Sequence, residues 1–145
     1  MDETIIKDIL KRYNKKYNKD LYYMDIIESN YPTLNDGKTK ANIPLNQWGG
    51  NWTKNKIIYI NKNLKPVKDY YKFKGNINDL KKQLIAHELA HEIESIKDNK
   101  NFKQKIIDKA LKSNFSTEYL DTINKNNKQY LTELFCEYLA KDVLK

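Results

Sequence analysis

The sequence has almost no cysteine and no long hydrophobic run. The single cysteine, Cys136, excludes an internal disulfide framework. No apolar run approaches the roughly 18 residues that a membrane-spanning helix needs. The first residues, MDETIIKDILKRY, are charged throughout and lack the hydrophobic region of a secretory signal. We therefore expect a cytoplasmic protein that does not enter a membrane.

Arginine is nearly absent as well, although the chain is basic. The 27 basic residues against 19 acidic ones give a net charge of +8, yet Arg12 is the only arginine. Proteins that read DNA sequence rely on arginine for bidentate contacts with bases. The lysines are also spread along the chain, which favours a solvated surface, so we do not expect nucleic-acid binding.

The remaining composition is that of a folded protein. The chain has 145 residues, of which 39% are hydrophobic, and it includes 11 tyrosines. A chain of this length can bury roughly two-thirds of its unfolded surface. Global disorder is therefore excluded, and we expect one domain over residues 1–145.

Hydrophobic periodicity predicts helices over much of the chain. These segments are 3–17, about 79–97, 101–112, 116–125 and 128–144. The apolar residues of segment 79–97 fall on two stripes, so we expect this central helix to be buried on more than one side. Asn76 or Asn78 is expected to cap its start. The stretch before it, 63–76, is expected to be a loop.

The middle of the chain predicts strands. Residues 41–48 and 55–63 flank Gly49-Gly50 and are interpreted as a hairpin. Pro44 indicates that the first strand lies at the edge of a sheet. The predicted fold class is α+β, with a small antiparallel or mixed sheet whose edge hairpin packs on the central helix and the C-terminal helices.

The central helix carries the only two histidines of the chain, in the motif His87-Glu88-Leu89-Ala90-His91. Residues four apart lie one helical turn above each other, so both imidazoles point the same way. Two neutral imidazoles supply half of a tetrahedral zinc site. In zinc hydrolases with this HExxH motif the glutamate acts as general base on the metal-bound water, which is the role predicted for Glu88. The alternative is two partly buried histidines on an amphipathic helix.

A catalytic zinc site needs a third protein ligand and an open position. The terminal helix offers Glu133, Cys136 and Glu137, which share one face at i, i+3 and i+4. Glu133 is the predicted ligand, and Glu137 would then hold an imidazole N–H. Glu137 and Cys136 stay open as alternative ligands. Glu94, one turn beyond His91, either supports the site or faces solvent.

The sequence HELAH at 87–91, followed by ELFCEYLA at 133–140, resembles the ImmA/IrrE family of zinc metallopeptidases. Their pattern is HExxH on one helix and ExxAxxFA on a later one. The resemblance covers roughly residues 57–144. The chain departs from the family pattern at three positions, Ala90, Cys136 and Leu139.

This resemblance implies a fold, a metal and a substrate class. The fold would be a minimal zincin-like domain. Zn²⁺ would be bound by His87, His91 and Glu133, with Glu88 as the base. The substrate would be a protein, often a transcriptional repressor of a phage or mobile element.

A second resemblance competes with the first. ELFCEY also resembles the ExFAExF stretch of lethal-factor-like toxin peptidases and secreted proline-specific endopeptidases. These enzymes would use the same ligands, with Glu137 as a supporting carboxylate. They carry a catalytic tyrosine seven residues before the ligand glutamate, where this chain has Asn126.

Peptide hydrolysis at such a site also requires a donor for the oxyanion. Tyr130 is the predicted donor, and Tyr119 is the alternative. We expect the substrate to lie extended along the edge strand of the 41–61 hairpin. Trp48 and Trp52 flank the hairpin loop and either form a substrate wall or cover the core.

Two other classes of function remain open. The first is a non-catalytic, zinc-containing module that binds a partner. The second is a DNA-binding regulator, although the chain has no helix-turn-helix signal. The metallopeptidase is the preferred prediction because the two histidines and Glu88 are all present.

Overall fold

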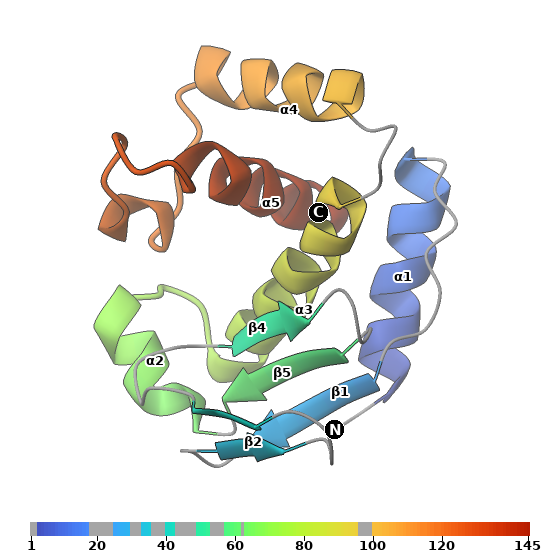
Figure 1. The fold of residues 1–145 in the computed structure, drawn as a ribbon, viewed down its shortest axis with the longest axis vertical. Helices are drawn as coiled ribbons and strands as arrows, with labels where there is room; N and C mark the ends of the chain where they lie inside the picture. Colours follow the sequence, from blue (N-terminus) through green and yellow to red (C-terminus); the bar gives the residue numbers. More distant parts are fainter. Residues whose placement is uncertain are drawn as a thin grey trace.

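A computed structural model gives the fold of the chain (Figure 1). It describes the backbone of residues 3–17, 25–29, 33–35, 40–42, 49–52, 57–61, 63–95 and 100–145. It describes the side chains of residues 4–17, 60, 63–95 and 100–145. Every statement below concerns these residues.

Helices occupy most of the described chain. They are α1 (Glu3–Tyr17), α2 (Leu64–Tyr71), α3 (Ile77–Glu94), α4 (Lys100–Lys112), the short 3₁₀ helix η2 (Leu120–Thr122) and α5 (Tyr130–Val143). α3 lies in the middle of the molecule and α5 packs across it (Figure 1). α4 covers α5, α1 contacts both α3 and α5, and α2 contacts α3. Among the described residues, no helix has the length and apolar character that a membrane crossing requires.

The central helix begins at a capping box. The Asn76 side chain accepts from Asp79 N at 2.8 Å, and the Asp79 carboxylate accepts from Asn76 N at 3.2 Å. Asn76 is therefore the cap, and Asn78 lies inside the helix. The helix ends at Glu94, whereas the predicted end at Lys97 lies outside the described residues. Its residues from Gln83 to Ala90 are all buried, which confirms burial on more than one side.

The first helix is tied to both central helices. Tyr13 is fully buried, and its hydroxyl donates to the Ala86 carbonyl of α3 at 2.7 Å. The Tyr17 hydroxyl donates to the Asp142 carboxylate of α5. The apolar stripe predicted for residues 3–17 is thus the face that α1 buries.

Two predictions about connecting segments are wrong. The stretch 63–76 contains α2, because Pro66 stands in the first helical turn, where its missing N–H costs no hydrogen bond. The stretch 116–125 holds only η2 and turns instead of a helix. Here the Thr117 hydroxyl accepts from Leu120 N at 3.2 Å, and the Asn124 side chain accepts from Asn126 N at 2.9 Å. Such side-chain bonds compete with helical ones.

The backbone of the middle segment forms short strands. These are β1 (Asp25–Ser29), β2 (Thr33–Asn35), β3 (Lys40–Asn42), β4 (Gly49–Trp52) and β5 (Ile57–Asn61). β5 pairs with β1 in parallel and with β4 in antiparallel orientation, and β2 pairs with β3. Gly49 and Gly50 therefore lie within a strand opposite Ile60 and Tyr59, not in the predicted loop. Pro44 and Trp48 lie outside the described residues.

The core of the described part is helical, and the predicted α+β fold is wrong for it. Of the residues whose side chains are described, 74% are helical and 1% lie in a strand. Ile60 is the one strand residue among the buried hydrophobic side chains. The physical reason is that the buried residues of α3 from Gln83 to Ala90 lie on more than one side of the helix, and α5 makes its most extensive contact, with α1, α2, β4 and β5 packed around the rest. The chemistry of the motif residues therefore lies where α3 and α5 meet.

Candidate metal centre

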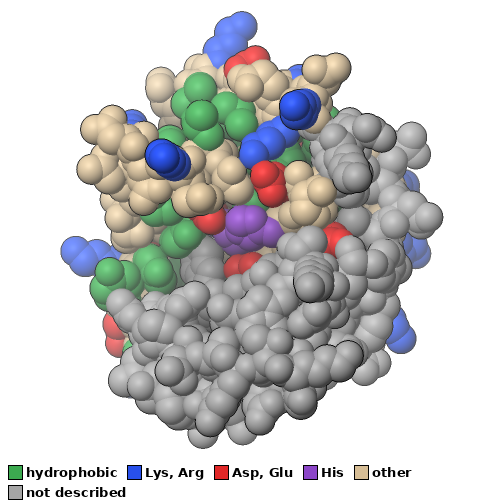
Figure 2. Space-filling model, in the orientation of Figure 1, with side chains coloured by type: hydrophobic (Ala, Val, Ile, Leu, Met, Phe, Trp, Pro, Cys, Tyr) green, Lys and Arg blue, Asp and Glu red, His purple; other side chains and the backbone are tan. Residues whose placement is uncertain are grey.

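The two histidines lie one above the other on the side of α3 that faces α5. Their ring centroids are 4.9 Å apart, and the rings meet at 72°. The His87 side chain is 2% exposed, whereas that of His91 is 23% exposed. Histidine side chains appear near the centre of the face shown in Figure 2, with acidic side chains beside them. The site therefore opens to solvent on the His91 side.

Glu133 reaches both histidines from α5. Its Oε2 atom lies 2.8 Å from His87 Nε2, and its Oε1 atom lies 3.5 Å from His91 Nε2. Oε2 is buried, and its contact with His87 Nε2 is a hydrogen bond only when that nitrogen carries a proton. A buried carboxylate oxygen at this place needs either that proton or a cation beside it.

Glu137 holds the other nitrogen of His87. Its Oε2 atom lies 2.7 Å from His87 Nδ1 and accepts from Gln83 Nε2 at 3.2 Å. Its Oε1 atom accepts from the Thr117 hydroxyl at 2.7 Å. Because an ionised carboxylate can only accept, Nδ1 carries the proton and Nε2 turns toward Glu133. Glu137 thus makes the imidazole contact expected of it, and its 1% exposed side chain is fully occupied there.

Cys136 lies close to the two histidines and is completely buried. One ligand atom from each of His87, His91 and Cys136 lies within 4.8 Å of the other two. Burial raises the pKa of the Cys136 thiol well above its ordinary value, and the charges of Glu133 and Glu88 raise it further. Without a metal the sulfur is therefore a neutral thiol.

The charges of the site are strongly coupled. Burial alone would lower the pKa of His87, but its contacts with Glu133 and Glu137 outweigh burial and raise it well above the ordinary value. Burial alone would raise the pKa of Glu133, but His87 and His91 lower it far below the usual range. A proton on the imidazoles thus compensates the carboxylates, at the same place where a divalent cation would do so.

Glu88 is buried beside this cluster. It follows His87 on α3 and is 3% exposed. Its charge contributes to the raised pKa of His87, which is consistent with its closeness to the imidazole. The predicted base therefore lies within the electrostatic reach of the cluster.

The two predicted tyrosines lie in different places. The Tyr119 ring packs edge to face against His87, with the centroids 5.4 Å apart. Burial raises the pKa of Tyr119 well above its ordinary value, so its hydroxyl stays protonated and can donate. Tyr130 is 7% exposed and lines a separate cavity of about 270 Å³ beside Ala110 and Leu120. The structure thus brings Tyr119, and not the preferred Tyr130, against the histidines.

Glu94 links the helices at the open end of the site. It pairs with Lys103 Nζ at 2.8 Å, and the same ammonium donates to the Thr132 hydroxyl at 3.1 Å. Glu94 therefore connects α3 with α4 and α5 instead of facing solvent alone. The strand and the tryptophans predicted to line the substrate fall on residues whose side chains are not described.

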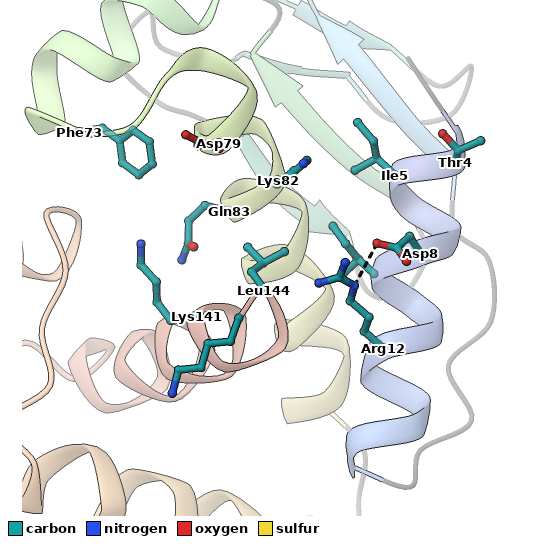
Figure 3. A pocket seen from close by; sticks show the side chains of 12 residues that line it. Thr4, Ile5, Asp8, Arg12, Phe73, Asp79, Lys82, Gln83, Lys141 and Leu144 are labelled. Atoms are coloured by element: carbon teal, nitrogen blue, oxygen red, sulfur yellow. Dashed lines mark ion pairs between the residues drawn. The ribbon is translucent and has the colours of Figure 1, made fainter.

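Sequence reasoning missed Gln83 and Thr117. Gln83 stands one turn before His87 on the same stripe, so helical spacing alone indicated that it is close. Thr117 gave no signal, because it lies in a segment that was expected to be helical. Gln83 also lines a cavity of about 660 Å³ between α1, α3 and α5 (Figure 3). The residues that line this cavity do not include His87, His91 or Glu133, so it is distinct from the candidate centre.

The donor set of the centre fits a zinc ion. Two imidazole nitrogens and one carboxylate oxygen are a donor set that catalytic zinc sites use. The buried Glu133 Oε2, 2.8 Å from His87 Nε2, supplies the oxygen. Comparisons with protein-family models, with curated proteins and with solved structures find no match for this chain. The motif residues and their geometry are therefore the evidence on function.

Proposed function

We propose that this protein is a zinc-dependent metallopeptidase that hydrolyses peptide bonds of a protein substrate. The observation that carries the proposal is the position of Glu133, whose buried Oε2 lies 2.8 Å from His87 Nε2. His91 Nε2 lies 3.5 Å from the other oxygen of the same carboxylate. Three side chains from two helices thus point at one place, and their donors are those that zinc prefers.

The residues around this place have complementary tasks. His87, His91 and Glu133 would hold the metal, and zinc would supply a Lewis acid that polarises the scissile carbonyl. Glu137 fixes the orientation of His87 through Nδ1 and is itself held by two donors. The packing of α5 on α3 therefore sets the geometry of the ligands.

Glu88 is the proposed general base. Its carboxylate takes the proton of the attacking water and passes it to the leaving amine. Tyr119 is preferred over Tyr130 as donor to the oxyanion, because its protonated phenol belongs to the ring that packs on His87. A repressor of a phage or mobile element is the substrate that the motif resemblance suggests.

Metal content tests the proposal directly. Protein purified without added metal is compared with Glu133→Ala and Glu88→Gln by mass spectrometry. We expect about one zinc per chain in the wild type and in Glu88→Gln, and a large loss in Glu133→Ala. Glu118→Gln is the control, because this half-buried glutamate accepts from Lys74 N at 3.1 Å and is not one of the proposed ligands.

Hydrolysis is then measured with a library of quenched fluorogenic peptides. We expect the wild type to cleave members of the library, and Glu88→Gln to keep zinc and lose cleavage. A wild type that takes up no zinc after incubation with it would refute the proposal. A wild type that binds zinc but matches Glu88→Gln in every biological effect would identify a binding module instead.

A further inference from the structure

Among the described residues near the candidate centre, Cys136 is a potential ligand to which the proposed function gives no task. It follows Glu133 by three residues on α5, so both side chains leave the same face of this helix. Its sulfur belongs to a cluster in which the ligand atoms of His87, His91 and Cys136 all lie within 4.8 Å of one another. The side chain is 0% exposed, so solvent does not compete for the sulfur.

We infer that Cys136 Sγ is a fourth metal ligand, which closes the metal site in the resting protein. This inference rests on the proposed function, because it requires that the histidines and Glu133 hold a metal. Glu133 and Cys136 approach the same pair of imidazoles from one helix. A cation between the histidines therefore meets the carboxylate and the sulfur together.

The spacing supports ligation by small movements of the side chains. In a tetrahedral site the zinc–sulfur distance is about 2.3 Å and the zinc–nitrogen distance about 2.0–2.1 Å. At tetrahedral angles these lengths place a nitrogen and the sulfur about 3.6 Å apart, so shifts of about 1 Å bring the donors to the ion. The cluster has its atoms within 4.8 Å without any ion to draw them together. The buried Glu133 Oε2, 2.8 Å from His87 Nε2, adds an acidic oxygen that faces the same pair of histidines.

Ligation by Cys136 is an exchange of one proton for one metal ion. The S–H bond breaks, the metal–sulfur bond forms, and the proton goes to solvent, so no oxidant or reductant is needed. The resulting set has two imidazoles, one carboxylate and one thiolate. Four protein ligands are typical of a closed zinc site, whereas a catalytic site keeps one position open. Hydrolysis would then require the sulfur to leave the metal.

Cobalt substitution provides the test. Co²⁺ occupies nitrogen, oxygen and sulfur sites in place of zinc, and a thiolate on Co²⁺ gives a near-ultraviolet charge-transfer absorption that nitrogen and oxygen ligands do not give. We expect this absorption in the wild type loaded with Co²⁺. Cys136→Ala and Cys136→Ser should retain the visible bands of bound Co²⁺ and lose the charge-transfer absorption.

Cadmium gives a second measurement that does not depend on activity. Because thiolate is a soft ligand, Cys136→Ser should weaken Cd²⁺ binding by at least about tenfold more than it weakens Zn²⁺ binding. Co²⁺ that binds the wild type without the charge-transfer absorption would overturn the role of Cys136 and leave the proposed function intact. A wild type that binds none of the three metals would overturn both. The wild-type spectrum alone is decisive even if a variant fails to fold.

Discussion

Replacing Thr117 by valine tests whether the carboxylate behind His87 positions the metal ligands. The substitution keeps the shape of the side chain and removes the hydroxyl, which donates to Glu137 at 2.7 Å and accepts from Leu120 N at 3.2 Å. Thr117 is buried, and water cannot replace its hydroxyl without a rearrangement. The substitution therefore breaks two buried hydrogen bonds at once.

The cost follows from these two bonds. A hydrogen bond to a charged group contributes about 1.5–3 kcal/mol, and a buried N–H left unsatisfied costs about 1–3 kcal/mol. Since the effects overlap, we expect Thr117→Val to lower the free energy of unfolding by about 2–4 kcal/mol. Loss of a group that orients a metal-binding histidine also weakens metal binding by about 10–100-fold.

Urea unfolding followed by tyrosine fluorescence measures the first effect, and zinc titration against a chelating dye measures the second. Thr117→Ser keeps the hydroxyl and should restore most of both. Thr122→Val is the matched control, because its hydroxyl donates to the Tyr119 carbonyl at an exposed position. An unfolding free energy within about 0.5 kcal/mol of the wild type, together with unchanged zinc affinity, would refute the positioning role.

Three further predictions concern stability. A strong chelator should lower the unfolding temperature of the zinc-loaded wild type, measured by calorimetry, and leave that of Glu133→Ala unchanged. The reason is that a ligand at 100 times its Kd stabilises the folded protein by about 2.7 kcal/mol. Equal shifts in the two proteins would place the metal elsewhere. Leu134→Ala should lower the free energy of unfolding by about 2–5 kcal/mol, because Leu134 is fully buried. Leu131→Ala on the same helix should lower it by under about 0.5 kcal/mol, because Leu131 is 47% exposed. Similar losses of unfolding free energy in urea would contradict the packing of α5. Burial would raise the pKa of Asp142, but the Tyr17 hydrogen bond and nearby lysines lower it overall. The ionised Asp142 therefore stabilises the fold at pH values above the ordinary aspartate pKa of about 4. This stabilisation is lost as the pH falls through the lower pKa of the folded state. The difference in stability between the wild type and Asp142→Asn should therefore shrink in acid, and a constant difference across a pH series of urea melts would contradict this.

The helices that carry the centre were predictable because their signals are local. Asn76 and Asp79 mark the start of α3 by a capping box, which needs only residues three apart. The spacing of His87 and His91 likewise fixes a shared face within one helix. The sequence also placed Glu133 and Glu137 on one face of α5, but spacing alone could not say which of them meets Nε2 and which meets Nδ1.

The parts that failed depend on contacts between distant segments. Gly49 and Gly50 look like a turn in isolation, and only pairing with β5 makes them a strand. The α+β prediction assigned the cover of α3 chiefly to a sheet, whereas α5 makes its most extensive contact and the described core is helical. Tyr119 and Thr117 lie in a segment of turns, so no periodicity could bring them to the face of His87.

The tie between α1 and α3 has a consequence for any attempt to isolate the motif region. Ala86, whose carbonyl accepts the Tyr13 hydroxyl, immediately precedes His87. A fragment beginning at β5 would contain every proposed ligand but would leave this carbonyl and the apolar face opposite α1 open to water. Exposed apolar surface of that kind favours aggregation. The segments that carry the motifs are therefore not sufficient to build the metal centre in another protein. Such a design would also need a helix that takes the place of α1.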